Sequence, residues 1–468
     1  MSNASRPAAA RRFFVETLGC PKNVVDSDKI VGTLLADGLV RADGPGDADL
    51  VVVNTCAFIE AAREESIETI LALASARKDG AQLVATGCLA ERSGAELADA
   101  LPELDAVVGF AGESSIAAAV GLVGTSTPVR FRATPTGVRD LLELPRAAPD
   151  TPWAYVKIAE GCDRACAFCA IPTFRGKQRS RRPEAIEAEV RDLVEHGVSE
   201  VVLVAQDLAW YGRDADEPGS LAPLLHRLDA LAAHGLSRVR LLYLYPSEVH
   251  DPLVSTMLEL PTVVPYFDLS LQHASAPLLR AMKRWGDGER FLKILERIRA
   301  DEPAAAFRSS FIVGFPGETE RHHDELLGFL AAARLDWAGF FAFSREEGTA
   351  AESLPGAPEP ALVTERLREL AEMQEPLTEA GRAALVDETI EVLVDGFEDG
   401  EPVGRTYREA PEIDGVVRLT GDGWARPGAT VRAIVTGWEG PDLEAEAVGP
   451  ARTVDTVGAV RSAGVGTA

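Results

Sequence analysis

The chain has 468 residues, too many for one ordinary core, so we expect about three domains of roughly 150 residues each. Hydrophobic residues make up 46% and charged residues 26%, a composition that excludes wholesale disorder. Lys and Arg number 47 against 73 Asp and Glu, which gives a formal net charge of −26. This acidity argues against a protein that binds the phosphate backbone of nucleic acids through a net positive charge, and it favours a basic partner.

The sequence contains no apolar run near the roughly 20 residues that a membrane helix needs. Residues 1–12 are polar and lack the apolar stretch of a signal peptide. Six cysteines in the whole chain are too few for a secreted disulfide scaffold. We therefore expect a cytoplasmic protein with reduced thiols and no membrane contact.

Residues 12–122 are predicted to form an α/β domain with an open parallel sheet. Apolar, β-rich runs alternate with amphipathic segments, which is typical of parallel strands joined by crossover helices. The expected strands are 13–18, 50–54, 82–86 and 106–110, and the expected helices are 24–39 and 58–77.

One cysteine follows each of the first three strands, namely Cys20, Cys56 and Cys88. The carboxyl ends of neighbouring parallel strands share one edge of a sheet, and that edge is where such folds bind ligands. The alternative interpretation is that all six cysteines of the chain are buried structural thiols. The regular placement after strands favours a metal or cluster site.

A second βα series is predicted over residues 151–372, after a linker at 123–150 that is rich in Gly, Thr, Pro and Ala. The expected strands are 154–159, 200–205, 238–243, 266–271, 308–313 and 337–343, with helices at 183–196, 221–234 and 289–300 among them. Six βα units predict a partial barrel, and in barrels the chemistry lies in the loops after the strands.

The last region, 373–449, follows a helix-like segment at 359–382 and differs in pattern. Short alternating runs at 389–394, 415–419 and 430–436 are separated by Gly-Asp and Asp-Gly turns, which predicts a small OB-like β-barrel. Residues 450–468 are rich in Ala, Gly and Val and are expected to be disordered.

Cys162, Cys166 and Cys169 have the spacing C-x3-C-x2-C directly after the first strand of the partial barrel. A structural zinc site needs four ligands, and no second pair of cysteines is available in this region. Three thiolates suit three irons of a four-iron, four-sulfur (4Fe-4S) cluster and leave the fourth iron open. A zinc site completed by an external ligand remains the alternative.

This loop resembles that of radical S-adenosylmethionine (SAM) enzymes, in which the open iron binds SAM and one electron cleaves it to a radical. The resemblance implies SAM as a cofactor. It also implies that the loop with Gly314, Gly317 and Glu318 lies against SAM, although a tight turn before a helix would have the same sequence. Phe168 either stacks near the adenine or packs the cysteine loop. No catalytic residue is singled out.

The segments 17–23, 53–58 and 85–88 are similar to the three cysteine segments of the methylthiotransferase family, and the third region resembles its TRAM domain. The resemblance implies a second 4Fe-4S cluster on Cys20, Cys56 and Cys88 that takes part in sulfur delivery. The implied reaction replaces C–H by C–S–CH3, with one SAM supplying the methyl group and another the radical. A sulfur donor, an electron donor such as flavodoxin or ferredoxin, and a monomeric enzyme are expected.

The family has two branches, and three features favour the one that modifies the β-carbon of an aspartate in the twelfth small-subunit ribosomal protein. Segments 268–275 and 407–415 resemble that branch. Residues 375–449 contain 17 acidic and 6 basic residues, and an acidic barrel suits a basic protein better than RNA. The alternatives are a tRNA (isopentenyladenosine) methylthiotransferase and a two-cluster electron carrier.

Two further residues have open roles. Arg175 begins a basic run at 175–182, which is either a solvated loop or a site for the carboxylate of SAM or of a substrate aspartate. His273 follows a strand and is predicted to be a hydrogen-bonded structural residue.

Overall fold

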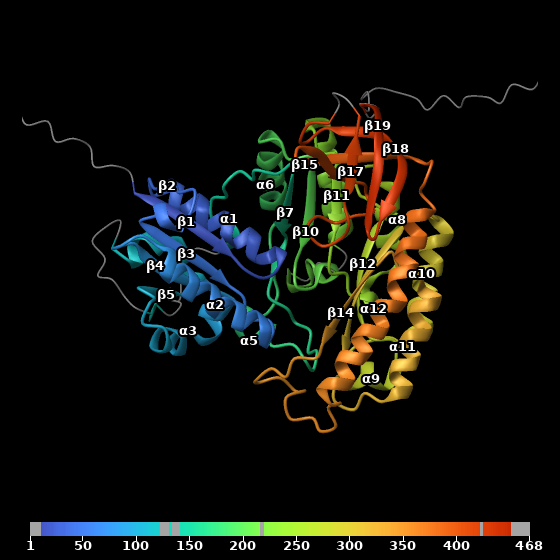
Figure 1. Cartoon of the computed structure of the whole chain (residues 1–468), viewed down its shortest axis with the longest axis horizontal. Coiled ribbons are helices and arrows are strands. Elements are labelled where there is room, and N and C mark those ends of the chain that lie inside the picture. The colour runs from blue at the N-terminus through green and yellow to red at the C-terminus, as the bar shows by residue number, and fades with distance from the viewer. Residues whose placement is uncertain (1–10, 122–130, 133–140, 216–219, 422–424, 451–468) are drawn as a thin grey trace, which may run out of the picture.

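The structure is a computed structural model that describes residues 11–121, 131–132, 141–215, 220–421 and 425–450. An N-terminal α/β domain, a central half-barrel and a small C-terminal β-barrel follow one another along the chain (Figure 1). None of the helices in these residues is long and apolar enough to cross a membrane. The predicted tail at 450–468 lies outside the described residues except for its first residue.

The N-terminal domain has the predicted parallel sheet, with strand order β2-β1-β3-β4-β5-β6. Its strands are Arg12–Thr17 (β1), Val40–Arg41 (β2), Leu50–Thr55 (β3), Gln82–Gly87 (β4), Ala106–Val108 (β5) and Phe131–Arg132 (β6). Its helices are Pro21–Ala36 (α1), Glu60–Ala76 (α2), Cys88–Ala100 (α3) and Ile116–Ala119 (α4). The sequence did not predict β2 or β6, because two residues are too few to show an alternating pattern, and it also missed α3.

The predicted linker contributes to the N-terminal domain where it is described. β6 pairs with β5, so this segment adds the last strand of the sheet. Lys29 on α1 donates a 2.6 Å hydrogen bond to the carbonyl of Leu142. Arg146 forms ion pairs with Asp28 at 2.7 Å and with Glu189 of the half-barrel at 3.0 Å. The segment after residue 140 is therefore packed between two domains.

The central region forms the predicted partial barrel from six parallel strands. They are Trp153–Lys157 (β7), Glu200–Val204 (β10), Arg238–Leu241 (β11), Tyr266–Gln272 (β12), Ala306–Val313 (β13) and Trp337–Ala342 (β14). β7, β10 and β11 make one half and β12, β13 and β14 the other, and parallel bridges such as Leu244 to Leu269 join the two. A short ribbon of Ala159–Glu160 (β8) and Arg179–Ser180 (β9) follows the first strand.

Helices cover the outer face of the half-barrel. They are Pro183–Glu195 (α6), Leu221–Asp229 (α7), Asp251–Glu259 (α8), Ala276–Ala281 (α9), Gly288–Asp301 (α10) and Glu320–Ala333 (α11), while Ile171–Arg175 (α5) lies toward the N-terminal domain (Figure 1). The predicted helix 221–234 ends early, at Asp229, and continues as a 3-10 turn over Ala230–His234.

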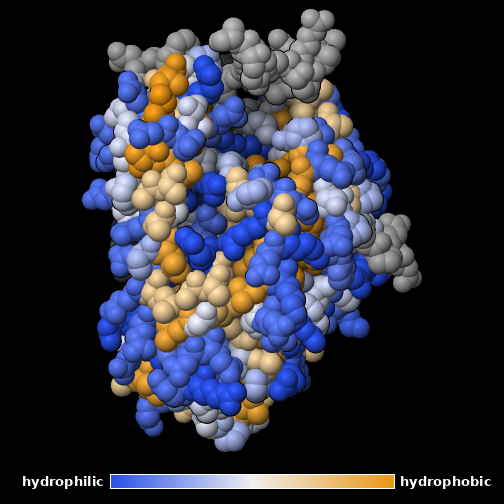
Figure 2. Space-filling model, turned by 90° about the vertical axis from the view of Figure 1, so that its right-hand side faces the viewer, coloured by the Kyte–Doolittle hydropathy of each residue, from blue (hydrophilic) through white to orange (hydrophobic). Residues whose placement is uncertain are grey.

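α10 shows why these helices form where they do. Its Asp287 side chain accepts a 2.9 Å hydrogen bond from the Arg290 backbone and caps the first turn. Phe291, Ile294, Leu295 and Ile298 recur at helical spacing and are buried. The outward face that carries α10 and α11 mixes hydrophilic with scattered hydrophobic residues (Figure 2). The apolar stripe is therefore turned toward the strands.

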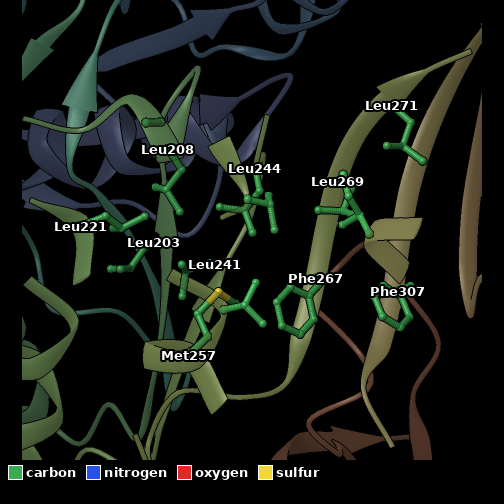
Figure 3. Packing of buried hydrophobic residues seen from close by; sticks show 14 of the residues in the cluster. Leu203, Leu208, Leu221, Leu241, Leu244, Met257, Phe267, Leu269, Leu271 and Phe307 are labelled. Atoms are coloured by element: carbon green, nitrogen blue, oxygen red, sulfur yellow. The ribbon is translucent and has the colours of Figure 1, made fainter. Parts of the chain in front are cut away.

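The core of the half-barrel lies between strands and helices. Leu203, Leu241 and Phe267 from three neighbouring strands lie in one layer with Met257 of α8 (Figure 3). All four side chains have no exposed surface. This layer fixes the strand spacing, and thereby the loops that follow each strand.

The C-terminal region is the predicted small β-barrel, closed in the order β15-β16-β17-β19-β18. Its strands are Thr389–Glu398 (β15), Glu401–Arg405 (β16), Val417–Thr420 (β17), Thr430–Glu439 (β18) and Asp442–Pro450 (β19). The sequence missed β16 and β19, whose outward faces carry Glu and whose apolar face is largely small residues. One continuous helix, Pro360–Ala383 (α12), leads into the barrel.

The segment 405–414 of the small barrel lies against the starting ends of the half-barrel strands. Trp337 Nε1 donates to the Arg408 carbonyl at 2.7 Å, and the Tyr155 hydroxyl donates to the Pro411 carbonyl at 3.1 Å. Because both aromatic residues lie on barrel strands near their first residues, the small barrel caps the end opposite the loops that follow the strands.

A glycine of α1 tests the packing of the segment predicted as a linker, and a glycine of α11 serves as its control. A Cβ at Gly32 in α1 would lie 2.4 Å from the Pro145 carbonyl oxygen, whereas a Cβ at Gly328 in α11 would meet nothing within 4 Å. We expect Gly32→Ala to lower the melting temperature, because the linker segment must move. Gly328→Ala should raise stability by about 0.5–1 kcal/mol through helix propensity. Thermal unfolding followed by circular dichroism measures both, and an unchanged melting temperature for Gly32→Ala would contradict the close approach.

Candidate functional site

The three N-terminal cysteines lie at one edge of the parallel sheet. Cys20 precedes α1, Cys56 follows β3, and Cys88 is the first residue of α3 directly after β4. Gly19 has φ of 93°, and a Cβ there would lie 2.8 Å from the Cys56 sulfur. The loop that carries Cys20 is thus pressed against Cys56, and glycine is required for that approach.

The charges around these thiols show that they are mutual neighbours. Burial raises the pKa of Cys88 to about 12 and also raises the pKa of Cys56, and the negative charge of a Cys20 thiolate adds to both shifts. Burial acts in the same direction on Cys20, but the positive charges of Lys22 and Arg175 outweigh it and lower the Cys20 pKa. Cys20 is therefore the most readily ionised of the three.

Arg175 reaches these cysteines from α5 of the half-barrel. Its Nη2 and Nε donate to the Cys88 sulfur at 3.1 and 3.3 Å, and its Nη2 also donates to Asn23 Oδ1 at 2.7 Å. Its Nη1 donates to both oxygens of Glu160, at 2.9 and 3.0 Å. The residue is 7% exposed, so the solvated-loop interpretation is wrong. The carboxylate bound here is Glu160 of the same chain, and contact of Arg175 with the carboxylate of SAM or of a substrate stays a prediction.

Lys157, Asp26 and Glu160 complete this buried network. The Lys157 ammonium donates to Glu160 at 2.7 Å and to Asp26, and Arg175 pairs with Asp26 at 3.3 Å. Burial alone would raise the pKa of Glu160, but Arg175 and Lys157 outweigh it and hold that pKa well below its usual range. Sequence reasoning missed this network. Its one signal was a lysine at the end of the apolar strand β7.

The second cysteine set lies in the loop after β7 and β8. The loop is fixed by backbone hydrogen bonds: Cys162 N donates to the Gly176 carbonyl at 3.1 Å, and Ala167 N donates to the Met282 carbonyl at 2.9 Å. Burial raises the pKa of Cys162 to about 11 and that of Cys169 to about 12. These thiols are protonated at neutral pH, so binding a metal or cluster there releases protons.

Two arginines flank the second cysteine loop. Arg164, within the loop, donates to Asp207 at 2.6 Å, and Arg284 Nη1 lies 3.5 Å from the Cys166 sulfur. Both guanidinium carbons lie 3.9 Å from the centre of the Tyr245 ring. The ring thus holds two cations beside the loop, and both were missed by sequence reasoning.

The loop predicted to lie against SAM is a tight turn. Glu318 accepts a 2.5 Å hydrogen bond from the Gly314 backbone and a 3.0 Å hydrogen bond from Arg366 of α12. A Cβ at Gly314 would lie 2.6 Å from Val363, whereas one at Gly317 would meet nothing within 4 Å. Glu318 therefore closes the turn, and Gly317 faces open space. Contact of these three residues with SAM stays a prediction.

Phe168 and His273 take structural positions in this region. Phe168 is half-buried and packs against the half-barrel core, and its contact with SAM also stays a prediction. His273 is fully buried and accepts a 3.0 Å hydrogen bond from the Ser275 backbone through Nδ1. Burial lowers the pKa of His273 to about 3, so the ring is neutral. Nδ1 makes the hydrogen bond that the sequence predicted, whereas Nε2 is buried without a partner among the described residues, and a structural role stays a prediction.

The N-terminal domain closes the open side of the half-barrel. Val25 of α1 packs with Tyr155 and Val202 on the inner strand faces. At the far edge, the loop after β14 places Glu346, 2% exposed at its side chain, against Arg92 at 2.8 Å and against Arg63. Ionic contacts therefore join the two domains at both edges of the half-barrel.

The donor chemistry of both sets fits an iron–sulfur cluster. All six cysteines are free thiols, and each set supplies three. In the described part of the chain, no three His, Cys, Asp or Glu side chains are placed to hold a single metal ion. A 4Fe-4S cluster makes a different demand, because its thiolates bind separate irons. Three reduced thiols on one loop, or on one sheet edge, match that demand.

Comparison with known proteins shows which families the three domains match. Residues 156–330 match the radical SAM superfamily, residues 386–448 the TRAM domain, and residues 12–109 a family described as Uncharacterized protein family UPF0004. The fold is also similar to the radical S-adenosylmethionine methyltransferase TsrM of Kitasatospora setae, with a TM-score of 0.53, 15% identity, and 73% of this chain and 75% of that chain covered. The chain is thus a radical SAM protein, a class that implies SAM and a 4Fe-4S cluster.

Similar proteins identify the family within this class. The chain is 43% identical to the ribosomal protein uS12 methylthiotransferase RimO of a Nocardioides species, covering 95% of this chain and 99% of that protein. It is 43% identical to the RimO protein of Desulforudis audaxviator, covering 95% and 98%. It is 41% identical to that of Salinispora arenicola, covering 95% and 97%. The chain belongs to the RimO methylthiotransferase family.

The Glu346 contact can be tested by removing its charge. Glu346→Gln leaves Arg63 and Arg92 with a neutral partner, and we expect a loss of about 1–3 kcal/mol. Hydrogen exchange should become faster around residues 57–60 and 344–356, which meet at this edge. Glu347→Gln is the matched control, because the neighbouring side chain is exposed. Equal exchange rates in the two variants would contradict the proposed junction.

Proposed function

We propose that the chain is a radical SAM methylthiotransferase that converts the β-carbon C–H of an aspartate in ribosomal protein uS12 to C–S–CH3. One observation supports this above the others: a single buried network, through Arg175 and Glu160, joins the cysteine edge of the N-terminal domain to the half-barrel that carries the second set. Relatives across 95% of the chain carry the same activity in their names.

Cys162, Cys166 and Cys169 would hold the cluster that binds SAM, and Cys20, Cys56 and Cys88 a second one. A cluster held by Cys162, Cys166 and Cys169 would supply the electron for SAM cleavage, and one held by Cys20, Cys56 and Cys88 would take part in sulfur delivery. The chain's own residues set the surroundings. Arg164 and Arg284 place positive charge beside the loop of Cys162 and Cys166, and Tyr245 holds both guanidinium groups in position.

The buried network contributes no net charge between the two sets. Lys157 and Arg175 are balanced by Asp26 and Glu160, and all four side chains are at most 6% exposed. With Val25 packed into the inner face of the half-barrel, the N-terminal domain excludes water from this junction. A carbon radical needs such enclosure, because stray C–H and S–H hydrogen donors would consume it.

The acidic C-terminal barrel supports a basic protein substrate. Residues 375–449 hold 17 acidic and 6 basic residues, which disfavours RNA and suits a lysine- and arginine-rich ribosomal protein. In this proposal the protein works as a cytoplasmic monomer with an electron donor such as flavodoxin or ferredoxin and a separate sulfur donor.

Replacing cysteines of the two sets should affect SAM cleavage and product formation differently. Replacing Cys162, Cys166 or Cys169 singly by Ala should reduce SAM cleavage, measured as 5′-deoxyadenosine, to background. Replacing Cys20, Cys56 or Cys88 should leave SAM cleavage and abolish the methylthio product, because only sulfur delivery is lost. Full product formation by a Cys20, Cys56 or Cys88 variant would make the N-terminal set structural.

The substrate is tested in a strain that lacks this gene. We expect mass spectrometry to show loss of the methylthio group from the uS12 peptide, while digested tRNA from the same culture is unchanged. Reintroducing the wild-type gene is the positive control, and the Cys162→Ala gene is the negative one. Loss from the tRNA nucleoside instead would keep the chemistry and overturn the assignment of the substrate.

A further inference from the structure

Arg175 is close in sequence to one cysteine set but contacts a cysteine of the other. It lies six positions after Cys169 in sequence, yet its side chain contacts Cys88 of the other set. Two of its nitrogens donate to this one sulfur, at 3.1 and 3.3 Å. The side chain is 3% exposed, so water does not compete for the sulfur.

The surrounding residues hold this guanidinium in place. Asn23 Oδ1 accepts from Nη2 at 2.7 Å, and Glu160 accepts from Nη1 at 2.9 Å. Phe110 covers one face of the guanidinium, with its ring centre 4.7 Å from the central carbon. A side chain fixed on three sides can keep its two donors on the sulfur, which the exposed arginines of a solvated loop cannot do.

Hydrogen bonds and positive charge at a cluster sulfur favour the reduced cluster, which carries one more negative charge. We infer that Arg175 is a positioning and redox-tuning residue for the N-terminal cluster, raising its reduction potential through the paired hydrogen bonds to Cys88. The inference rests on the proposed second cluster. The half-barrel, which cleaves SAM, thereby sets the redox behaviour of the cluster on the neighbouring domain.

The step concerned is a one-electron reduction without bond making or breaking. An external reductant, dithionite in the test below, supplies the electron, and the cluster accepts it. Arg175 gives up no proton in this step. Its hydrogen bonds strengthen as the charge on the sulfur grows, and this difference between the two states shifts the potential.

The test uses the full-length chain with Cys162, Cys166 and Cys169 all replaced by Ala, so that the N-terminal cluster alone is observed. In this parent, a dithionite titration followed by electron paramagnetic resonance measures the midpoint potential. Arg175→Lys keeps the charge but loses the paired donors. We expect at least about tenfold less reduced cluster at a fixed potential, a shift of about 59 mV downward for one electron.

A second variant gives the opposite sign. Asp26 accepts from both Nη atoms of Arg175 at 3.3 Å, so Asp26→Asn removes negative charge beside the guanidinium. The potential should rise, because the Arg175 charge is then less neutralised. A fall in the potential of this variant refutes the inference even if Arg175→Lys does not fold. Arg284→Lys is the matched control, because Arg284 contacts only the other set's Cys166 among the cysteine sulfurs of the described chain, and its potential should equal that of the parent.

The outcomes separate two failures. A parent that assembles no cluster, shown by iron content and spectrum, refutes the proposed second cluster itself. A parent with a cluster whose potential is unchanged by Arg175→Lys refutes the inference about Arg175 alone. A fall with Asp26→Asn also refutes it. Opposite shifts from the two variants, with none from Arg284→Lys, support it.

Discussion

The arrangement of the site depends on one buried ionic network, formed by Arg175, Glu160, Lys157 and Asp26. Charges removed from water are costly unless they are paired and hydrogen-bonded, and removing one partner leaves the others uncompensated, at a cost of about 3–5 kcal/mol. Three of these residues come from the half-barrel, and Asp26 comes from α1. The network is satisfied only when the two domains meet in this geometry, so it specifies their placement as well as adding to stability.

A second buried network does the same for the C-terminal barrel. Glu200 at the start of β10 accepts from Arg240 at 2.7 Å and from Arg405 of β16 at 3.1 Å. Burial would raise the pKa of Glu200, but the two arginines outweigh it and lower that pKa to about 2. Arg405 lies at the start of the segment that caps the half-barrel. The small barrel is therefore anchored at the strand ends opposite the loop that carries Cys162, Cys166 and Cys169.

These two buried ionic networks hold three domains that have separate roles. The half-barrel positions Cys162, Cys166 and Cys169 by its core, and its Arg175 contacts Cys88 of the N-terminal set. The N-terminal sheet brings together three cysteines that the sequence separates widely. In the proposed function, the acidic C-terminal barrel offers negative charge to a basic protein substrate.

The sequence by itself determined the elements and the donor atoms. Alternating apolar patterns predicted the parallel sheet, the half-barrel and the small barrel, and cysteines placed after strands predicted two sets of three. The sequence shows these features because the residues of one strand, and the cysteine that follows it, lie within a few positions of one another. Only the tertiary structure decided that Arg175 serves Cys88, that Glu318 is tied to Arg366, and that the linker supplies β6. Arg175 and Asp26 are 149 residues apart, and a local pattern carries no information about such a contact. Arg175 could be a solvated charge as far as the sequence shows, because Asp26 and Cys88 lie on another domain and only the folded chain buries the guanidinium against them.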